Sequence, residues 1–226
     1  KVDKIFINGL KQFKSFEYNI PGDISSASFF IVLTLLSKKS QIIIENVNVN
    51  KSRDGIIQIL NKMGANIKLK NKKLYKGEEV ADIHVKSITK LNSINCPSKL
   101  NSSAIDEFLI IFLVAAKAYG ISKFKDLGEM NKKESKRLDL AIKFLRLIGI
   151  KVERFNNDIN IHGNPKIMLS KNFEITNFLK DHRIFFLSCI AALTLGGKWK
   201  INDKKSANTS FPQFLKILKF LGANIN

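Results

Sequence analysis

Asp181, His182 and Arg183 are three consecutive ionisable residues at the start of an almost wholly apolar segment, 184–193. A helix this apolar is expected to be buried. Asp181 suits the first turn of such a helix, because a carboxylate there caps free N–H groups and is favoured by the helix dipole. Arg183 is not explained in this way, because a guanidinium opposes the dipole and cannot be buried without an anionic partner. We therefore expect Arg183 to face either a structural acid or an anionic ligand.

Polar residues also stand at the start of two other predicted apolar helices. Ser25 and Ser26 precede the segment 27–36, where a hydroxyl group either caps the helix or binds a phosphate. Asp106 precedes the segment 108–118, and capping is again the simpler interpretation of its carboxylate. Polar groups therefore occupy the beginning of each strongly apolar helix.

A charged stretch before the amphipathic segment 135–147 contains Lys133, Glu134 and Arg137. Lys133 and Arg137 are four residues apart and therefore share one face of a helix. Two cations on one face repel each other by about 0.2–0.5 kcal/mol, which a solvated surface tolerates. A catalytic interpretation needs a reason to place this face beside Arg183, and an internal repeat supplies one.

The sequence repeats one series of elements three times: an acid before an apolar helix, then a strand, an amphipathic helix and a glycine. The acids are 83 and 75 residues apart and the glycines are 85 and 73 residues apart, so two independent landmarks follow one period. We interpret this as a structural repeat. The acids are Asp23, Asp106 and Asp181, and the glycines are Gly64, Gly149 and Gly222.

Three such units predict an α/β fold of approximate threefold symmetry, with parallel apolar helices inside and sheets outside. The helix N-termini then meet on one face, which gathers free N–H groups and therefore binds anions. The polar stretch 46–54 divides the first unit and is a candidate domain boundary. The third unit lacks its closing strands, so we expect an incomplete domain. Segments 4–7 and 16–20 are predicted to form an N-terminal hairpin.

The chain has 226 residues, of which 45% are hydrophobic, so it can form one or two domains with a substantial core. Its formal net charge of +19 favours anionic partners, but the lysines are scattered and no nucleic-acid-binding motif is present. We therefore expect small anionic substrates and no nucleic-acid partner. The apolar runs 108–116 and 184–195 are shorter than the ~20 residues that span a bilayer, so we expect no membrane insertion.

Cys96 and Cys189 are far apart and form no metal-binding or redox motif, which favours a reducing compartment. Residues 1–4 lead into a strand-like segment, so we expect no signal peptide. We expect a cytoplasmic protein that uses neither a metal ion nor a cofactor.

Four motifs resemble, in order, those of the 5-enolpyruvylshikimate-3-phosphate synthase (EPSP synthase) family. They are Pro-Gly-Asp-Ile-Ser-Ser-Ala at 21–27, Lys-Glu-Ser-Lys-Arg at 133–137, Asp-His-Arg-Ile at 181–184 and Ser-Phe-Pro at 210–212. The resemblance covers essentially the whole chain and implies two domains of three repeats each, which close over the substrates. It implies that residues 1–51 are the tail of the N-terminal domain and residues 52–226 most of the C-terminal domain.

The resemblance implies a transferase of the shikimate pathway, which leads to chorismate and the aromatic amino acids. In this reaction the 5-hydroxyl of shikimate 3-phosphate adds to phosphoenolpyruvate, and inorganic phosphate leaves. By resemblance Asp106 is the general base, Glu134 handles the proton at the methylene carbon, and Lys133 polarises the hydroxyl group. The substrate-binding residues that the resemblance implies are Ser25, Ser26, Glu129, Arg137, His182, Arg183 and Thr209.

In that assignment Arg137 and Arg183 hold the carboxylate of phosphoenolpyruvate as planar forks, and Ser26 binds the phosphate of shikimate 3-phosphate. Thr209 stands where some members carry a phosphate-binding lysine. A lysine, a glycine-rich loop and a further arginine of the family belong to a half that this sequence does not contain. We therefore expect little or no activity from this chain alone, and a monomer at full length.

Two alternatives remain open. UDP-N-acetylglucosamine enolpyruvyl transferase shares the fold, although the motif at 181–183 and the set of Lys133, Glu134 and Arg137 speak against it. A non-catalytic basic module would bind any polyanion in a salt-dependent way that scales with the number of phosphates. Selective binding of shikimate 3-phosphate would instead favour the enzyme.

Overall fold

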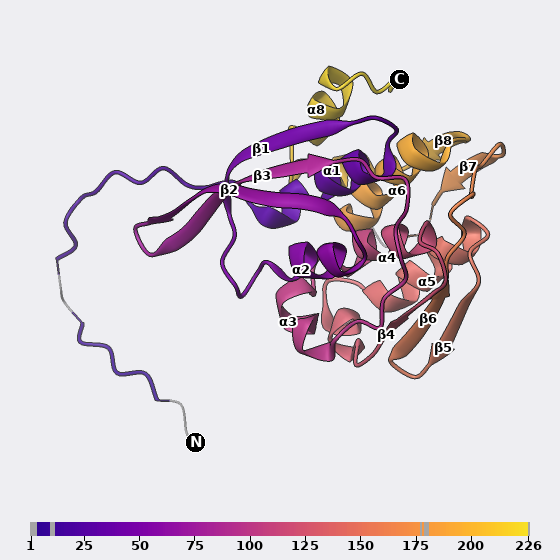
Figure 1. Cartoon of the computed structure of the whole chain (residues 1–226). Helices are drawn as coiled ribbons and strands as arrows, with labels where there is room; N and C mark the ends of the chain where they lie inside the picture. Colours follow the sequence, from indigo (N-terminus) through magenta and orange to yellow (C-terminus); the bar gives the residue numbers. More distant parts are fainter. Residues whose placement is uncertain (1–3, 10–11, 177, 179–180, 226) are drawn as a thin grey trace.

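The computed structural model describes residues 4–9, 12–176, 178 and 181–225. Three helices at its centre pack against one another: α1 (Ile24–Leu36), α4 (Phe108–Ala116) and α6 (His182–Leu195). The sheets lie outside these helices (Figure 1). All nine residues of α4 are buried, as expected of a helix that is apolar on every side. The predicted α/β architecture with buried apolar helices is confirmed.

The first unit, residues 22–86, combines α1 with one amphipathic helix and a three-stranded sheet. The sheet has the order β1-β3-β2, and its neighbouring strands are antiparallel. The last strand of the unit therefore lies in the middle of the sheet. The elements after α1 are β1 (Gln41–Asn48), α2 (Gly55–Lys62), β2 (Asn66–Tyr75) and β3 (Glu78–Lys86).

The second unit, residues 92–162, has the same connectivity around α4. Its sheet has the order β4-β6-β5, again antiparallel with the last strand in the middle, which confirms the repeat. The elements after α4 are β4 (Ile121–Phe124), α5 (Arg137–Leu147), β5 (Val152–Phe155) and β6 (Asp158–His162). The unit also contains the short helices η1 (Ser98–Leu100), α3 (Asn101–Ala104) and η2 (Gly128–Lys132).

The third unit, residues 172–225, begins with a strand that the sequence patterns did not predict. This strand, β7 (Asn172–Ile175), pairs in parallel with β8 (Lys198–Ile201), which follows α6. Parallel bridges join Gly22 to Val47 in the first unit and Asn95 to Lys123 in the second. In each unit the chain before the buried helix therefore runs parallel to the strand after it. The unit ends with α7 (Lys205–Asn208) and α8 (Phe214–Phe220).

Glycines end the amphipathic helices as the sequence predicts. Gly64, Gly149 and Gly222 follow α2, α5 and α8 and have φ angles of +91°, +82° and +95°. At Gly149 and Gly222 an added Cβ would meet no atom within 4 Å. The left-handed backbone, and not crowding, is therefore what favours glycine at these two helix ends.

The chain continues without a structural break across positions 51 and 52, where the sequence analysis placed a domain boundary. β1 lies before this point and pairs with β3, which lies after it. α1 also lies before it and packs against α4 and α6 in one hydrophobic core. A boundary here would divide both a sheet and the core, so the stretch 46–54 is better described as the end of β1 and a loop within the first unit.

The predicted N-terminal hairpin is wrong. Residues 4–9 and 12–20 contain no strand, and residues 1–3 and 10–11 lie outside the described part of the chain. The described segment extends away from the folded body (Figure 1). A hairpin without a sheet to join is marginal, and these residues find no partner strand among those described. Six apolar side chains of the segment are each more than three-quarters exposed: Ile5, Phe6, Ile7, Phe13, Phe16 and Ile20.

Helix length bears on the predicted absence of membrane insertion. The longest described helix is α6, with 14 residues, whereas about 20 apolar residues are needed to span a bilayer. Within the described ranges, no helix is both long and apolar enough to cross a membrane.

Candidate active site

The N-terminal ends of α1, α4 and α6 meet on one face, which we call the rim and which contains Ser25, Asp106, Glu107, Asp181 and Arg183. Ser25 Oγ, in the first turn of α1, donates a hydrogen bond to Glu107 Oε1 over 2.5 Å. Arg183 Nη1, in the first turn of α6, donates to the backbone oxygen of Asp106 over 2.8 Å. These contacts link all three units, so the predicted convergence of the helix starts is confirmed.

Asp181 is the N-cap of α6, as its position in the sequence predicts. Its Oδ1 accepts a hydrogen bond from the backbone N–H of Arg183 over 2.9 Å. Its Oδ2 accepts from Ser135 Oγ over 2.6 Å and from Arg137 Nε over 3.1 Å. Burial raises the pKa of Asp181, but the hydrogen bond from Ser135 and the charge of Arg137 outweigh this effect and lower the pKa below its ordinary value. The carboxylate is therefore ionised and joins α5 to α6.

Arg137 is a buried cation that contacts three acids. Its side chain is 2% exposed. Its Nε contacts Asp181, its Nη1 lies 3.1 Å from Asp106 Oδ1, and its Nη2 lies 2.5 Å from Glu134 Oε2. The alternative of a solvated surface face therefore does not describe this residue. The three carboxylates compensate for removing the guanidinium from water.

Asp106 lies among three cations on the rim: Lys133, Arg137 and Arg183. Its Oδ1 lies 3.3 Å from Lys133 Nζ and 3.1 Å from Arg137 Nη1. Partial burial raises the pKa of Asp106, but the charges of Arg183, Lys133 and Arg137 outweigh it and lower the pKa. The side chain is 24% exposed, so an ionised carboxylate flanked by cations remains accessible to a ligand.

The sequence predicts that Arg183 faces either a structural acid or an anionic ligand. Its Nη1 contacts the backbone oxygen of Asp106 and lies 3.9 Å from Glu107 Oε1. Its Nε is buried and has no hydrogen-bond partner among the described residues. The guanidinium thus has an acid nearby but keeps unused hydrogen-bonding capacity, which suits an anionic ligand.

His182 lies beside Arg183 at the start of α6 and is only partly exposed. Burial is the main cause that lowers the pKa of His182, and the positive charge of Arg183 adds to it. The ring stands edge-on to Phe186, with 5.9 Å between ring centroids. We therefore expect a neutral imidazole at pH 7.

Similarity to known proteins identifies the family of this chain. The model of the family described as EPSP synthase (3-phosphoshikimate 1-carboxyvinyltransferase) matches residues 1–218. The chain belongs to the EPSP synthase family. Two relatives named 3-phosphoshikimate 1-carboxyvinyltransferase are similar to it: one from Ruthia magnifica subsp. Calyptogena magnifica, 38% identical over 224 residues, and one from Staphylococcus aureus (strain JH9), 36% identical over 214 residues.

The chain spans about half the length of the curated relatives that it matches. The two alignments cover 99% and 95% of this chain but 51% and 48% of the relatives. The solved EPSP synthase from Acinetobacter baumannii superposes with a TM-score of 0.85 at 32% identity, over 92% of this chain and 47% of that one. The enolpyruvyl transferase NikO from Streptomyces tendae shares the fold, with a TM-score of 0.68 at 16% identity over 90% of this chain and 43% of that one.

In this member of the EPSP synthase family, three predicted binding residues lie apart from the charged centre of the rim. Ser26 donates hydrogen bonds from its N–H and Oγ to Asp23, which caps α1. Glu129 forms an exposed ion pair with Lys132. Thr209 is exposed and donates to the backbone oxygen of Ser206. The structure therefore gathers Ser25, Asp106, Lys133, Glu134, Arg137, His182 and Arg183, but not these three.

Sequence reasoning missed Arg53, Glu107 and Ser135. Arg53 Nη2 donates to Ser25 Oγ over 2.9 Å and lies 3.7 Å from Asp23 Oδ1. Its loop precedes the amphipathic helix α2, just as the loop with Lys133 precedes α5. The repeat therefore carries a signal for Arg53, although the polar stretch 46–54 around it resembles a domain boundary.

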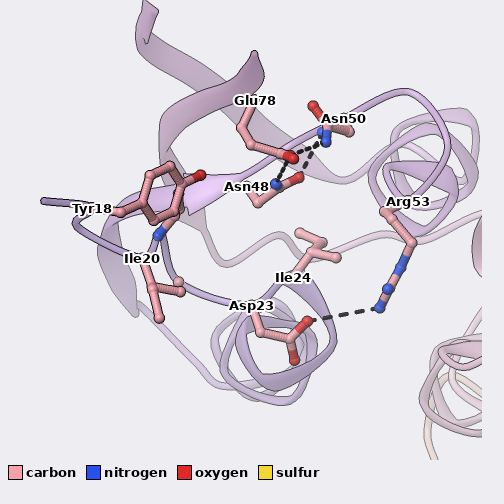
Figure 2. Close-up of a pocket in the computed structure, with 10 residues that line it drawn as sticks. Tyr18, Ile20, Asp23, Ile24, Asn48, Asn50, Arg53 and Glu78 are labelled. Atoms are coloured by element: carbon pink, nitrogen blue, oxygen red, sulfur yellow. Dashed lines mark hydrogen bonds and ion pairs between the residues drawn. The ribbon is translucent and has the colours of Figure 1, made fainter. Parts of the chain in front are cut away.

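A cavity of about 390 Å³ lies beside the rim, next to the start of α1 (Figure 2). The ion pair of Asp23 and Arg53 lines one side of it. On the other side Glu78 accepts hydrogen bonds from the side-chain amides of Asn48 and Asn50. The cavity reaches the rim through Arg53, which also contacts Ser25.

Both cysteine thiols are buried. Among the described residues, His, Cys, Asp and Glu side chains form no group of three or more that could hold a metal ion. Burial raises the pKa of Cys96 to about 11 and that of Cys189 to about 12, so neither thiol is a reactive thiolate at neutral pH.

Proposed function

We propose that the full-length protein containing this chain transfers the enolpyruvyl group of phosphoenolpyruvate to the 5-hydroxyl of shikimate 3-phosphate and releases inorganic phosphate. Membership of the EPSP synthase family supports this proposal. The observation that carries it is the position of Asp106, whose carboxylate is contacted by Lys133 and Arg137 and whose backbone oxygen is contacted by Arg183. Substrates that together carry two phosphates and two carboxylates require such a concentration of cations.

Asp106 is the proposed general base. Its lowered pKa keeps the carboxylate ionised at neutral pH, so it can accept the proton of the 5-hydroxyl. Lys133 Nζ lies near the same carboxylate oxygen and would polarise the hydroxyl as its proton leaves. The base Asp106 removes the proton, and the positive charge of Lys133 beside it stabilises the alkoxide that develops on the substrate.

Glu134 is the proposed residue that transfers a proton at the methylene carbon. Its side chain is 69% exposed, so a substrate can reach it. Its carboxylate contacts Arg137, which holds it on the same side as Asp106. Addition at the enol carbon places a proton on the methylene carbon, and the departure of inorganic phosphate removes a proton from it again. A second carboxyl group, protonated before the addition and again after the elimination, can do both separately from the base.

Arg183 is the proposed primary contact for the carboxylate of phosphoenolpyruvate, because its side chain is 14% exposed on the rim and its charge is balanced only by Glu107 at 3.9 Å among the ion pairs of the described residues. Arg137 is the proposed second contact. Because Arg137 already contacts three acids, a substrate carboxylate can bind it only by replacing one of them. Glu134 is the most exposed of the three and is the one we expect to be replaced. Binding of the substrate carboxylate would then free Glu134 from its ion pair with Arg137, and Glu134 would become available for the proton transfer.

Five further residues are assigned to the substrate site. We propose that Ser25, Ser26 and His182 line the substrate site, and that Glu129 and Thr209 approach it only when the other half of the protein closes over the rim. Closure would exclude water and strengthen each charged contact. We further propose a monomeric, cytoplasmic protein that uses no cofactor.

The proposal is tested with the purified full-length protein. Phosphate release from phosphoenolpyruvate should require shikimate 3-phosphate and should not occur with UDP-N-acetylglucosamine as acceptor. Turnover with the latter acceptor would identify the alternative transferase. Equal binding of unrelated polyanions, without turnover, would favour the non-catalytic module.

A further inference from the structure

Glu107 is a buried acid to which the proposed mechanism gives no role. It is 2% exposed and directly follows the proposed base, Asp106. Burial raises the pKa of Glu107, although the hydroxyl of Ser25 and the charge of Arg183 act in the opposite direction. A buried carboxyl group is costly unless other groups compensate, so its contacts are informative.

The N-cap residues of the three buried helices are Asp23, Glu107 and Asp181, so in the second unit the N-cap is the residue after the repeat landmark Asp106, and the three carboxyl groups are used in different ways. Asp23 and Asp181 have extended backbones, with ψ angles of 127° and 113°, and cap their own helices by accepting from Ser26 and Arg183. Glu107 holds the N-cap position of α4, but its ψ is −7° and its side chain makes no capping hydrogen bond. The short helix α3 precedes α4 and accounts for this helical backbone. The carboxyl group of Glu107 is therefore available to other units.

Glu107 uses this freedom to join the first unit to the third. Its Oε1 accepts from Ser25 Oγ over 2.5 Å, and the same Oγ accepts from Arg53 Nη2 over 2.9 Å. Its Oε1 also lies 3.9 Å from Arg183 Nη1. The charged or polar groups that face Glu107 are thus Ser25 from α1, Arg53 from the loop before α2, the neighbouring Asp106, and Arg183 from α6.

We infer that Glu107 is a positioning residue that orients the Arg183 guanidinium toward the carboxylate of phosphoenolpyruvate. This inference rests on the proposed function. Arg183 Nη1 is held between the backbone oxygen of Asp106 and the carboxyl group of Glu107. A planar guanidinium that is fixed at one Nη keeps a constant direction for its other donors, so the carboxyl group of Glu107, 3.9 Å from Nη1, acts on substrate binding through Arg183.

A purely structural role makes a different prediction. If Glu107 only tied α4 to α1 through Ser25, its replacement would lower stability and would affect both substrates alike. A positioning role acts on one substrate, because only phosphoenolpyruvate is assigned to Arg183. The ratio of the two KM values therefore separates the two roles.

The decisive variant is Glu107→Gln in the full-length protein. Glutamine keeps the size of the side chain and can still bond Ser25, but it removes the charge that faces Arg183. We expect the KM for phosphoenolpyruvate to rise about tenfold, the effect of one charge-assisted contact, with the KM for shikimate 3-phosphate within about twofold. Glu107→Asp, which keeps the charge but shortens the side chain, should fall between wild type and Glu107→Gln. The matched control is Glu174→Gln on β7, which removes the exposed partner of Lys200 and should change neither KM.

Hydrogen exchange at the Arg183 Nε–H, followed by NMR, gives a readout that does not depend on turnover. The buried Nε–H should exchange faster in Glu107→Gln than in wild type. An unchanged or lower KM for phosphoenolpyruvate, or an equal rise for both substrates, would overturn the inference, as would unchanged exchange. If the wild-type protein shows no turnover, the proposed function fails, and the exchange rate alone decides whether Glu107 holds Arg183.

Discussion

Arg137 Nε lies 3.1 Å from Asp181 Oδ2, and this contact joins the first turn of α5 to the N-cap of α6. The two side chains are 2% and 0% exposed. The same guanidinium reaches Asp106 and Glu134, because five donors in one plane can serve several acids at once. Two of the three units therefore share one buried ion-pair network beneath the proposed reacting groups.

Acid should destabilise the protein partly through Asp181, whose pKa is lowered from 3.8 because Ser135 and Arg137 outweigh its burial. A carboxyl group with a lower pKa in the folded state stabilises the protein above its unfolded pKa, and this contribution is lost as the pH falls toward the folded pKa. We expect the free energy of unfolding to fall below about pH 4. Asp181→Asn should be less stable at pH 7 and should lack this part of the slope.

Denaturant unfolding of both proteins between pH 7 and pH 3 measures this difference. Glu174→Gln, which removes the exposed partner of Lys200, is the control for loss of an acid outside the network. Parallel pH profiles for wild type and Asp181→Asn would show that another group causes the acid sensitivity.

Arg183→Ala should weaken binding of phosphoenolpyruvate far more than binding of shikimate 3-phosphate. Loss of a charge-assisted contact is worth about 1.5–3 kcal/mol, or roughly ten- to more than a hundredfold in affinity. Calorimetric titration of the full-length protein with each substrate measures the two effects. Arg154→Ala, which removes an exposed partner of Asp139, serves as the control. Equal losses for both substrates would count against the assignment of Arg183.

Asp106→Asn should reduce kcat by about 10²–10⁴, the usual contribution of a general base, with little change in substrate binding. Asparagine keeps the shape of the side chain but cannot accept the hydroxyl proton. Steady-state kinetics and substrate titrations on the same preparation separate the two quantities. A wild-type kcat would remove Asp106 as the base, and the exposed Glu134 would be the next residue to test.

Gly55→Ala should destabilise the protein, although alanine usually favours a helix by about 0.5–1 kcal/mol. An added Cβ would lie 2.5 Å from Ser103 Oγ and 2.7 Å from the Ser103 carbonyl carbon, because α2 begins against α3. We expect a loss of about 1–3 kcal/mol in the free energy of unfolding. Arg53, two residues earlier, would also shift from Ser25.

Ser103→Ala in the same chain removes the Oγ but not the backbone contact, so it should restore only part of this loss. Gly9→Ala, where no atom lies within 4 Å of the added Cβ, should have no effect. A Gly55→Ala protein as stable as wild type would show that α2 and α3 are less tightly packed than the structure indicates.

The helices of the core could be predicted from the sequence because their signals are local. The runs after Asp23 and Asp181 are apolar on every side, and the residues Gly64, Gly149 and Gly222 mark helix ends through their backbone conformation alone. The spacing of these landmarks also indicated the repeat, and with it the meeting of the helix starts. Asp181 and Arg183 could be identified because a charged side chain at the start of a buried helix needs either a capping role or a partner of opposite charge.

Other features depend on contacts between distant segments and left little local signal. β7 has four residues, and the strand with which it pairs, β8, lies beyond α6, so its pattern alone could not distinguish it from a loop. The roles of Arg53 and Glu107 arise where one unit touches another. The hairpin at 4–7 and 16–20 failed for the same reason, since alternation indicates a strand only where another strand can pair with it.

The entry of the chain into α4 differs from its entry into α1 and α6, because a single helical turn, α3, precedes it. That turn changes the backbone at one position and so frees a carboxyl group that its two counterparts spend on their own helices. Divergence among the three copies thus concerns the path of the main chain more than the residue type, since all three positions carry an acid. Backbone torsion at the three helix starts, more than the type of residue there, therefore distinguishes the unit whose carboxyl group is left to contact the other two.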